Sequence, residues 1–184
     1  MVWLLIVLVV ALAIGPILML RPKPRERAVA ALRAAARAAG LTVSVARVPH
    51  LGASAEDRVS AGGRDREPTI ECASYRLLAP GGLEDAPQWT LYRSERENRY
   101  LAGWTTLTPP LGLPPQPERY WQRIAAIVEA LPGGCLGVEA SADGVAWMGQ
   151  ERMGDSSAET IVQGIREGLE AIRDLHREGL GRDA

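Results

Sequence analysis

The sequence predicts an α+β fold in which one N-terminal transmembrane helix is followed by an antiparallel sheet with packed helices. Three observations support this prediction: an uncharged apolar run at the N-terminus, short strands joined by hairpin turns, and stretches with one apolar helical face. The predicted order after the membrane helix is α-β-β-β-β-α-β-β-α. It divides the chain into an anchor (1–21), a basic juxtamembrane helix (22–40) and a soluble domain (41–184).

The predicted anchor is the run from Val2 to Leu20, which contains no charged side chain. At ~1.5 Å per residue, nineteen helical residues span about 28 Å, close to the thickness of a membrane hydrocarbon core. No basic side chain precedes the run and no small-residue cleavage site follows it, so a permanent anchor is favoured over a cleaved signal peptide.

The charges beside this run predict its orientation. Residues 21–40 hold six basic side chains and one acidic side chain, whereas the whole chain has a net charge of −1. Because positive charge flanking a membrane helix stays in the cytoplasm, we expect a single-pass protein of the bacterial inner membrane with its domain in the cytoplasm. The lipid bilayer is then a partner, and anionic head groups would contact Arg21, Lys23, Arg25 and Arg27.

The first part of the domain is predicted as a helix, a strand and a loop. Apolar residues recur at helical spacing from Arg25 to Ala39, and Gly40 suits the helix C-terminus. The alternation over Leu41–Val48 predicts a strand. The stretch 49–68 lacks periodicity and is predicted as a long, mobile surface loop.

The middle of the chain predicts three strands, over Thr69–Leu78, Trp89–Ser94 and Tyr100–Leu107, the last two joined as a hairpin. The proline-rich segment 109–117 is interpreted as a stiff connector that leads into the next helix. A polyproline recognition motif is the alternative.

The last part predicts two helices around a second hairpin. One apolar stripe runs through Pro117–Leu131, and Asp143-Gly144 marks the turn between the strands Cys135–Ala140 and Val145–Gln150. The final helix begins at a capping box, Ser156 to Glu159, and ends at Gly179.

No motif in the sequence indicates chemistry. A metal site needs clustered ligands, but the only histidines, His50 and His176, are far apart and are interpreted as a solvated loop residue and a helix-end cation. Cys72 and Cys135 form no CxxC pair and are interpreted as half-buried thiols in a reducing compartment. Gly164 and Gly168 are interpreted as a close-packing site within the last helix. We therefore expect no catalytic, cofactor or metal residues.

Two resemblances bear on function. The apolar helix followed by Leu20-Arg21-Pro22-Lys23-Pro24 resembles the small single-pass accessory subunit of the bacterial Sec translocase, although the domain here is longer. This resemblance implies an accessory role in protein export or envelope assembly. The element order resembles the type III secretion chaperone-like fold, which implies topology alone.

These features together predict a non-enzymatic, cytoplasm-facing domain that binds or positions another protein. The mildly acidic domain excludes nucleic acid as a partner, because a nucleic-acid surface needs clustered basic residues. An accessory factor of protein export is the first alternative. A hydrolase-like enzyme with a dispersed site is the second.

Overall fold

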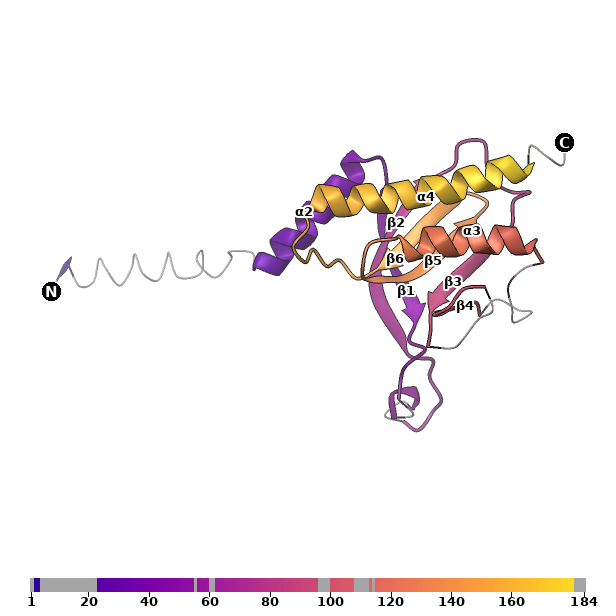
Figure 1. Cartoon of the computed structure of the whole chain (residues 1–184). Coiled ribbons are helices and arrows are strands. Elements are labelled where there is room, and N and C mark those ends of the chain that lie inside the picture. Colours follow the sequence, from indigo (N-terminus) through magenta and orange to yellow (C-terminus); the bar gives the residue numbers. More distant parts are fainter. Residues whose placement is uncertain are drawn as a thin grey trace.

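The computed structural model describes residues 2–3, 23–54, 56–59, 62–95, 100–107, 113 and 115–180 (Figure 1). Its elements are α2 (Pro24–Ala38), β1 (Thr42–Pro49), the 3-10 helix η1 (Glu56–Arg58), β2 (Thr69–Leu78), β3 (Trp89–Arg93), β4 (Trp104–Thr105), α3 (Glu118–Glu129), β5 (Cys135–Ser141), β6 (Gly144–Gly149) and α4 (Ala158–Leu180).

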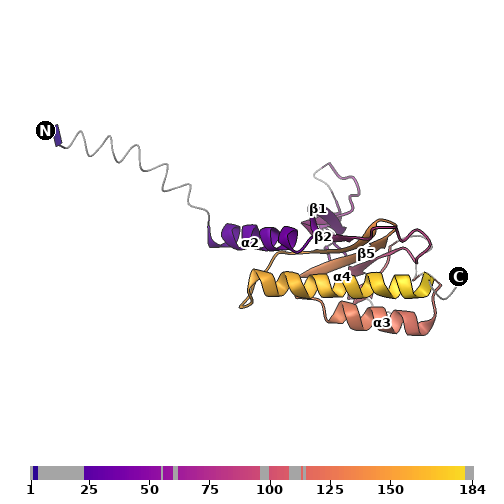
Figure 2. The same cartoon turned by 90° about the horizontal axis from the view of Figure 1, so that it is seen from above.

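The fold is a two-layer α+β arrangement. The strands form one six-stranded antiparallel sheet in the order β1-β2-β6-β5-β3-β4. Helices α3 and α4 lie on the same side of this sheet (Figure 2), and α2 packs against α4 and β1. The α+β class and the antiparallel sheet are thus confirmed, and none of the described helices lies on the other face of the sheet.

The prediction of a transmembrane helix is corrected by the structure. In the part of the chain that the structure describes, no helix is both long and apolar enough to cross a membrane. The longest, α4, has an apolar face and a charged face, and α2 is basic and amphipathic. Residues 4–22, which carry most of the predicted span, lie outside the described residues, so the described fold begins with α2.

A partly buried polar cluster fixes α2 to the sheet layer. Arg33 of α2 makes a bidentate ion pair with Glu151, with N–O distances of 2.8 and 2.7 Å. The hydroxyl of Tyr75 on β2 donates to the same carboxylate at 2.8 Å. Such paired N–H···O bonds are directional, so they set the orientation of the helix as well as stabilising it. Leu32 and Ala36 complete the contact by entering the core.

The segment that follows α3 packs closely against α4 at two glycines. A Cβ atom at Gly168 would lie 2.5 Å from Leu131 Cδ2, and one at Gly164 would lie 3.1 Å from Pro132 Cγ. The predicted close-packing site is therefore confirmed. The start of α4 differs from the prediction by one residue, because it is Ser157, not Ser156, whose hydroxyl accepts the N–H of Thr160.

The two predicted hairpins have different outcomes. The β5–β6 hairpin turns at Asp143-Gly144, as predicted. In the β3–β4 hairpin, the strand predicted over Tyr100–Leu107 is only Trp104–Thr105, because Leu101–Gly103 form a turn in which Gly103 has a φ of 77°. Because β4 has only two residues, the β3 side of the sheet ends in a very short edge strand.

Candidate binding cavity on the open face of the sheet

The face of the sheet opposite the helices carries its own apolar cluster. Side chains of a strand alternate between the two faces, so β2 sends Tyr75 and Ala73 to the helices and Cys72 to the other side. The buried members of this open-face cluster are Val48, Cys72 and Met148, and its half-buried members are Ala46, Ile70, Tyr92 and Leu136.

Backbone irregularity on β5 shapes this cluster. The register between β5 and β6 shifts between Cys135 and Gly137, which marks a bulge that includes Leu136. Gly137 has no side chain, and a Cβ atom there would lie 2.9 Å from Met148 Cε and 3.4 Å from Tyr92 Cδ1. Met148 and Tyr92 therefore close over the glycine and form a continuous apolar surface beside the bulge.

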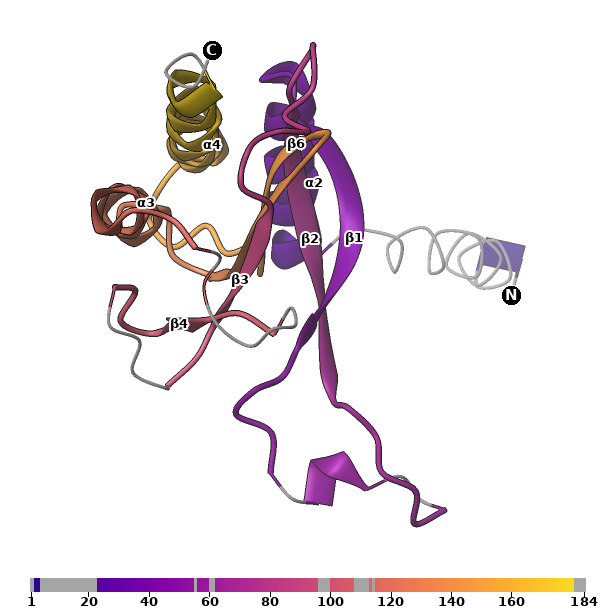
Figure 3. The same cartoon turned by 90° about the vertical axis from the view of Figure 1, so that its right-hand side faces the viewer.

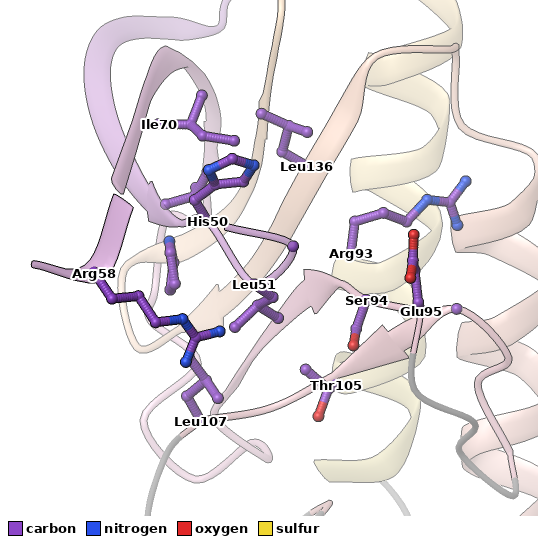
Figure 4. A pocket seen from close by; sticks show the side chains of 14 residues that line it. His50, Leu51, Arg58, Ile70, Arg93, Ser94, Glu95, Thr105, Leu107 and Leu136 are labelled. Carbon is purple, nitrogen blue, oxygen red and sulfur yellow. The ribbon is translucent and has the colours of Figure 1, made fainter. Parts of the chain in front are cut away.

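A cavity of about 760 Å³ lies at one end of the open-face cluster. Figure 4 shows that it lies between the segment around His50–Arg58 and the β3–β4 hairpin. Its lining includes three members of the cluster, Val48, Ile70 and Leu136, joined by Leu51 and Leu107. A volume of this size is in the range of sites that hold small molecules or peptide side chains.

The polar groups of the cavity come from both walls. His50 and Arg58 lie on one wall, and Arg93, Ser94, Glu95 and Thr105 lie on the other. In Figure 4 the Arg58 guanidinium extends between Leu51 and Leu107, whereas the Arg93 side chain points away from it. The Arg93 guanidinium lies 4.7 Å from the centroid of the Trp104 ring, a cation–π contact that holds it against the hairpin. Arg58 is thus the cation placed to meet a ligand.

The loop wall of the cavity has an internal structure that the sequence did not predict. The Ser54 hydroxyl donates to Asp57 at 2.8 Å and accepts the N–H of Asp57 at 3.3 Å, which caps η1. These hydrogen bonds hold the pKa of Asp57 below its usual value. The N–H of Arg66 donates to the Arg58 carbonyl at 2.7 Å. The 49–68 segment, predicted as a long, mobile surface loop, holds Arg58 on the short 3-10 helix η1. In Figure 3 the segment that carries η1 extends beyond the end of the sheet.

The residues predicted to contact membrane lipids do not line this cavity. Arg21 lies outside the described residues. The Lys23 N–H donates to Glu26 at 3.0 Å at the start of α2, and Arg25 and Arg27 are exposed on the first turn of that helix. The structure does not test lipid contact, which remains a prediction.

The two histidines have opposite surroundings. His50 is exposed and lines the cavity, in agreement with its interpretation as a solvated residue. His176 is only 2% exposed, which corrects its interpretation as a helix-end cation. Its Nε2 lies 2.6 Å from the hydroxyl of Tyr120, which also accepts the indole N–H of Trp89 at 2.7 Å.

Burial lowers the pKa of His176 to about 4, so the ring is neutral at pH 7. Because the Tyr120 oxygen already accepts the indole N–H of Trp89, we assign the hydroxyl proton of Tyr120 to the hydrogen bond with His176 Nε2. Trp89 and His176 also pack ring edge to face, with centroids 6.1 Å apart. This network joins β3, α3 and α4 inside the helix-facing core, and neither of its two hydrogen bonds involves the open face.

The two cysteines are free, buried thiols. Burial raises the pKa of both, that of Cys135 to about 12, which keeps this thiol protonated at neutral pH. They lie on β2 and β5, the two neighbours of β6. Two strand spacings amount to about 9.5 Å, beyond the roughly 7 Å between Cα atoms that a disulfide can bridge. Among the described residues, no group of three His, Cys, Asp or Glu side chains could hold a metal ion.

Sequence reasoning missed this cavity. Its floor comes from alternate residues of strands that were predicted, but its walls come from two segments predicted as a loop and as a longer strand. The available signal was the apolar character of both sides of β2, since Ile70 and Cys72 alternate with residues of the main core.

No protein-family model matches the chain, and no curated protein or solved structure matches it.

Proposed function

We propose that this protein is a non-catalytic protein-binding domain whose open sheet face receives an extended, apolar segment of another protein. The observation that carries this proposal is the continuity of the open-face cluster with the cavity lined by Ile70, Leu136 and Leu51. Apolar side chains that stay partly exposed on a sheet face, as those of Ile70, Tyr92 and Leu136 do, are typical of surfaces that a partner covers.

The shape and polarity of the site favour a peptide as the ligand. An extended chain projects alternate side chains to one side, which suits a surface made of neighbouring strands. Its apolar side chains would pack on the half-buried Tyr92, Leu136 and Ile70, and one would enter the cavity. A carboxylate on the ligand would meet Arg58, which makes no ion pair with any described residue.

A carboxylate on the cavity floor is expected to abolish this binding. Peptides would be selected for the full-length protein from a random library displayed on phage, and the affinity of a selected peptide would be measured by fluorescence anisotropy. Ile70→Asp would place an unpaired charge where the ligand's apolar side chain lies. We expect at least about a tenfold loss of affinity, because burial of an unpaired charge costs more than the ~1.4 kcal/mol that a tenfold change represents.

Ile127→Asp is the matched control, because Ile127 is also half-buried but lies on α3 in the helix layer. Thermal unfolding of both variants would show that each remains folded. The proposal predicts that the control binds the peptide like the wild type. Equal losses in both variants, unchanged binding by Ile70→Asp, or a library that yields no binding peptide would each contradict it.

A further inference from the structure

The outer edge of β1 presents unpaired backbone groups. β1 is the first strand of the sheet order, and among the described strands it pairs with β2 alone (Figure 3). It is eight residues long, whereas β4 at the other end of the sheet has only two. A long edge strand exposes a row of N–H and C=O groups that can pair with another strand.

The hydrogen bonds of β1 reveal which groups point outward. The N–H of His50 donates to the carbonyl of Pro68 at 2.8 Å, and this pair continues the β1–β2 register. Antiparallel residues alternate between facing the partner strand and facing away from it, so the even-numbered residues of β1 face β2. The outward residues are therefore Val43, Val45, Arg47 and Pro49.

Pro49 fits this assignment, because proline has no N–H and is tolerated at an outward position of an edge strand. Within the described part of the chain, the N–H groups of Val43, Val45 and Arg47 donate to no other segment. The side chain of Val45 is 62% exposed, the largest exposure among the apolar residues of the described sheet. The unpaired groups are thus centred on an exposed apolar residue.

We propose that β1 pairs antiparallel with β1 of a second copy of this chain, about a two-fold axis that passes through Val45. In this register Val45 pairs with Val45 of the second copy, and Val43 pairs with Arg47 in both directions. Every outward N–H of both strands then has a carbonyl partner. The helices of both copies lie on the same side of the joined sheet.

The register is selected by the sequence of the strand. An axis through Arg47 would place two guanidinium groups directly opposite each other, and an axis through Val43 would leave Arg47 outside the ladder. With the axis at Val45, each Arg47 opposes an apolar Val43 and keeps Glu71 as its cross-strand neighbour on β2. The ladder ends at Pro49, which would face Leu41 of the second copy. Proline has no N–H, and the N–H of Leu41 already donates to the carbonyl of Ala36 at 2.9 Å.

The surface beside Val45 has room for the second copy. A hollow of about 210 Å³ is lined by Val45, by Val29 and Arg33 of α2, and by Glu71. Val45 pairs with Ala73, whose side chain belongs to the helix-facing core, so Val45 points to the helix side of the sheet. The two valines of the dimer would meet next to this hollow, which gives the joined edges apolar contact as well as hydrogen bonds.

Cross-linking by single cysteines tests the register. Directly paired residues have Cα atoms about 5.5 Å apart, whereas the Cα atoms of Val43 in the two copies would be separated by about 14 Å. In the full-length protein, Val45→Cys is expected to give a covalent dimer with a short thiol-specific cross-linker, and Val43→Cys is expected to remain monomeric on a denaturing gel. Absence of the dimer in Val45→Cys, or equal dimer in both variants, would overturn the proposal.

Charge repulsion provides a second test. Val45→Lys would place two ammonium groups opposite each other, whereas Thr42→Lys adds the same charge opposite Val48 of the second copy. Sedimentation equilibrium of the full-length protein is expected to show dimers that Val45→Lys weakens at least tenfold and Thr42→Lys leaves unchanged. A wild-type protein that stays monomeric, or equal effects of both variants, would overturn the proposal. Peptide binding to the open face should survive Val45→Lys, so this result is independent of the proposed function.

Discussion

Replacement of Gly144 by alanine is expected to lower the free energy of unfolding by about 3 kcal/mol or more, as measured by urea denaturation. Gly144 has a φ of 148°, and a Cβ atom there would lie 2.2 Å from the carbonyl oxygen of Leu77. The turn cannot move aside freely, because the N–H of Ala79 donates to Asp143 at 2.9 Å and that of Leu83 donates to Ala142 at 2.8 Å.

Gly52→Ala provides the control for this prediction. A Cβ atom at Gly52 would meet no atom within 4 Å, and its backbone is outside the left-handed region. We expect this variant to differ from the wild type by less than about 1 kcal/mol. A Gly144→Ala protein as stable as Gly52→Ala would contradict the close approach of the β5–β6 turn to β2.

Lowering the pH from 7 to 4 is expected to reduce the free energy of unfolding by about 3 kcal/mol through protonation of His176 alone. The pKa of the buried ring is about 4, below its ordinary value of 6.5, so the unfolded chain binds more protons between these values. The contribution of His176 is therefore fully present above pH 6.5 and is lost as the pH falls toward 4. The measurement is urea denaturation at a series of pH values from 7 to 4.

The comparison with His176→Gln isolates this effect. Glutamine can still accept the hydroxyl hydrogen of Tyr120 but does not titrate, so its unfolding free energy should fall less steeply with acidification. His50→Gln is the control, since His50 is exposed, and it should keep the wild-type slope. If His176→Gln shows the same acid slope as the wild type, the buried neutral histidine is not the source of the effect.

The sequence predicted the elements whose signals are local. The strand predicted over Thr69–Leu78 is β2, and the Asp143-Gly144 pair located the β5–β6 turn. The strand predicted over Tyr100–Leu107 was too long, because the backbone turns at Gly103, where φ is 77°. The membrane helix was predicted from an apolar run alone, and the described helices are amphipathic.

The candidate site and the surroundings of His176 depend on contacts between distant segments. Leu51 and Leu107 line one cavity although more than fifty residues separate them in the chain. The position of His176 near the C-terminal end of a helix predicts that its protonated form is favoured. In the structure, however, Trp89 and Tyr120 enclose the ring, and its neutral form is favoured. Neither the cavity nor the surroundings of His176 leave a periodic pattern in the sequence, so local sequence patterns could not predict them.

The proposed function is tested most directly by locating the bound peptide. Methyl NMR spectra of the protein would be recorded during titration with a selected peptide. The proposed function predicts shifts for the methyl groups of Ile70, Leu136 and Leu51, which line the cavity. The methyl groups of Ile127 and Leu175 in the helix layer should remain unchanged. Shifts confined to the helix layer, with the cavity residues unaffected, would contradict the proposal that the open sheet face is the binding site.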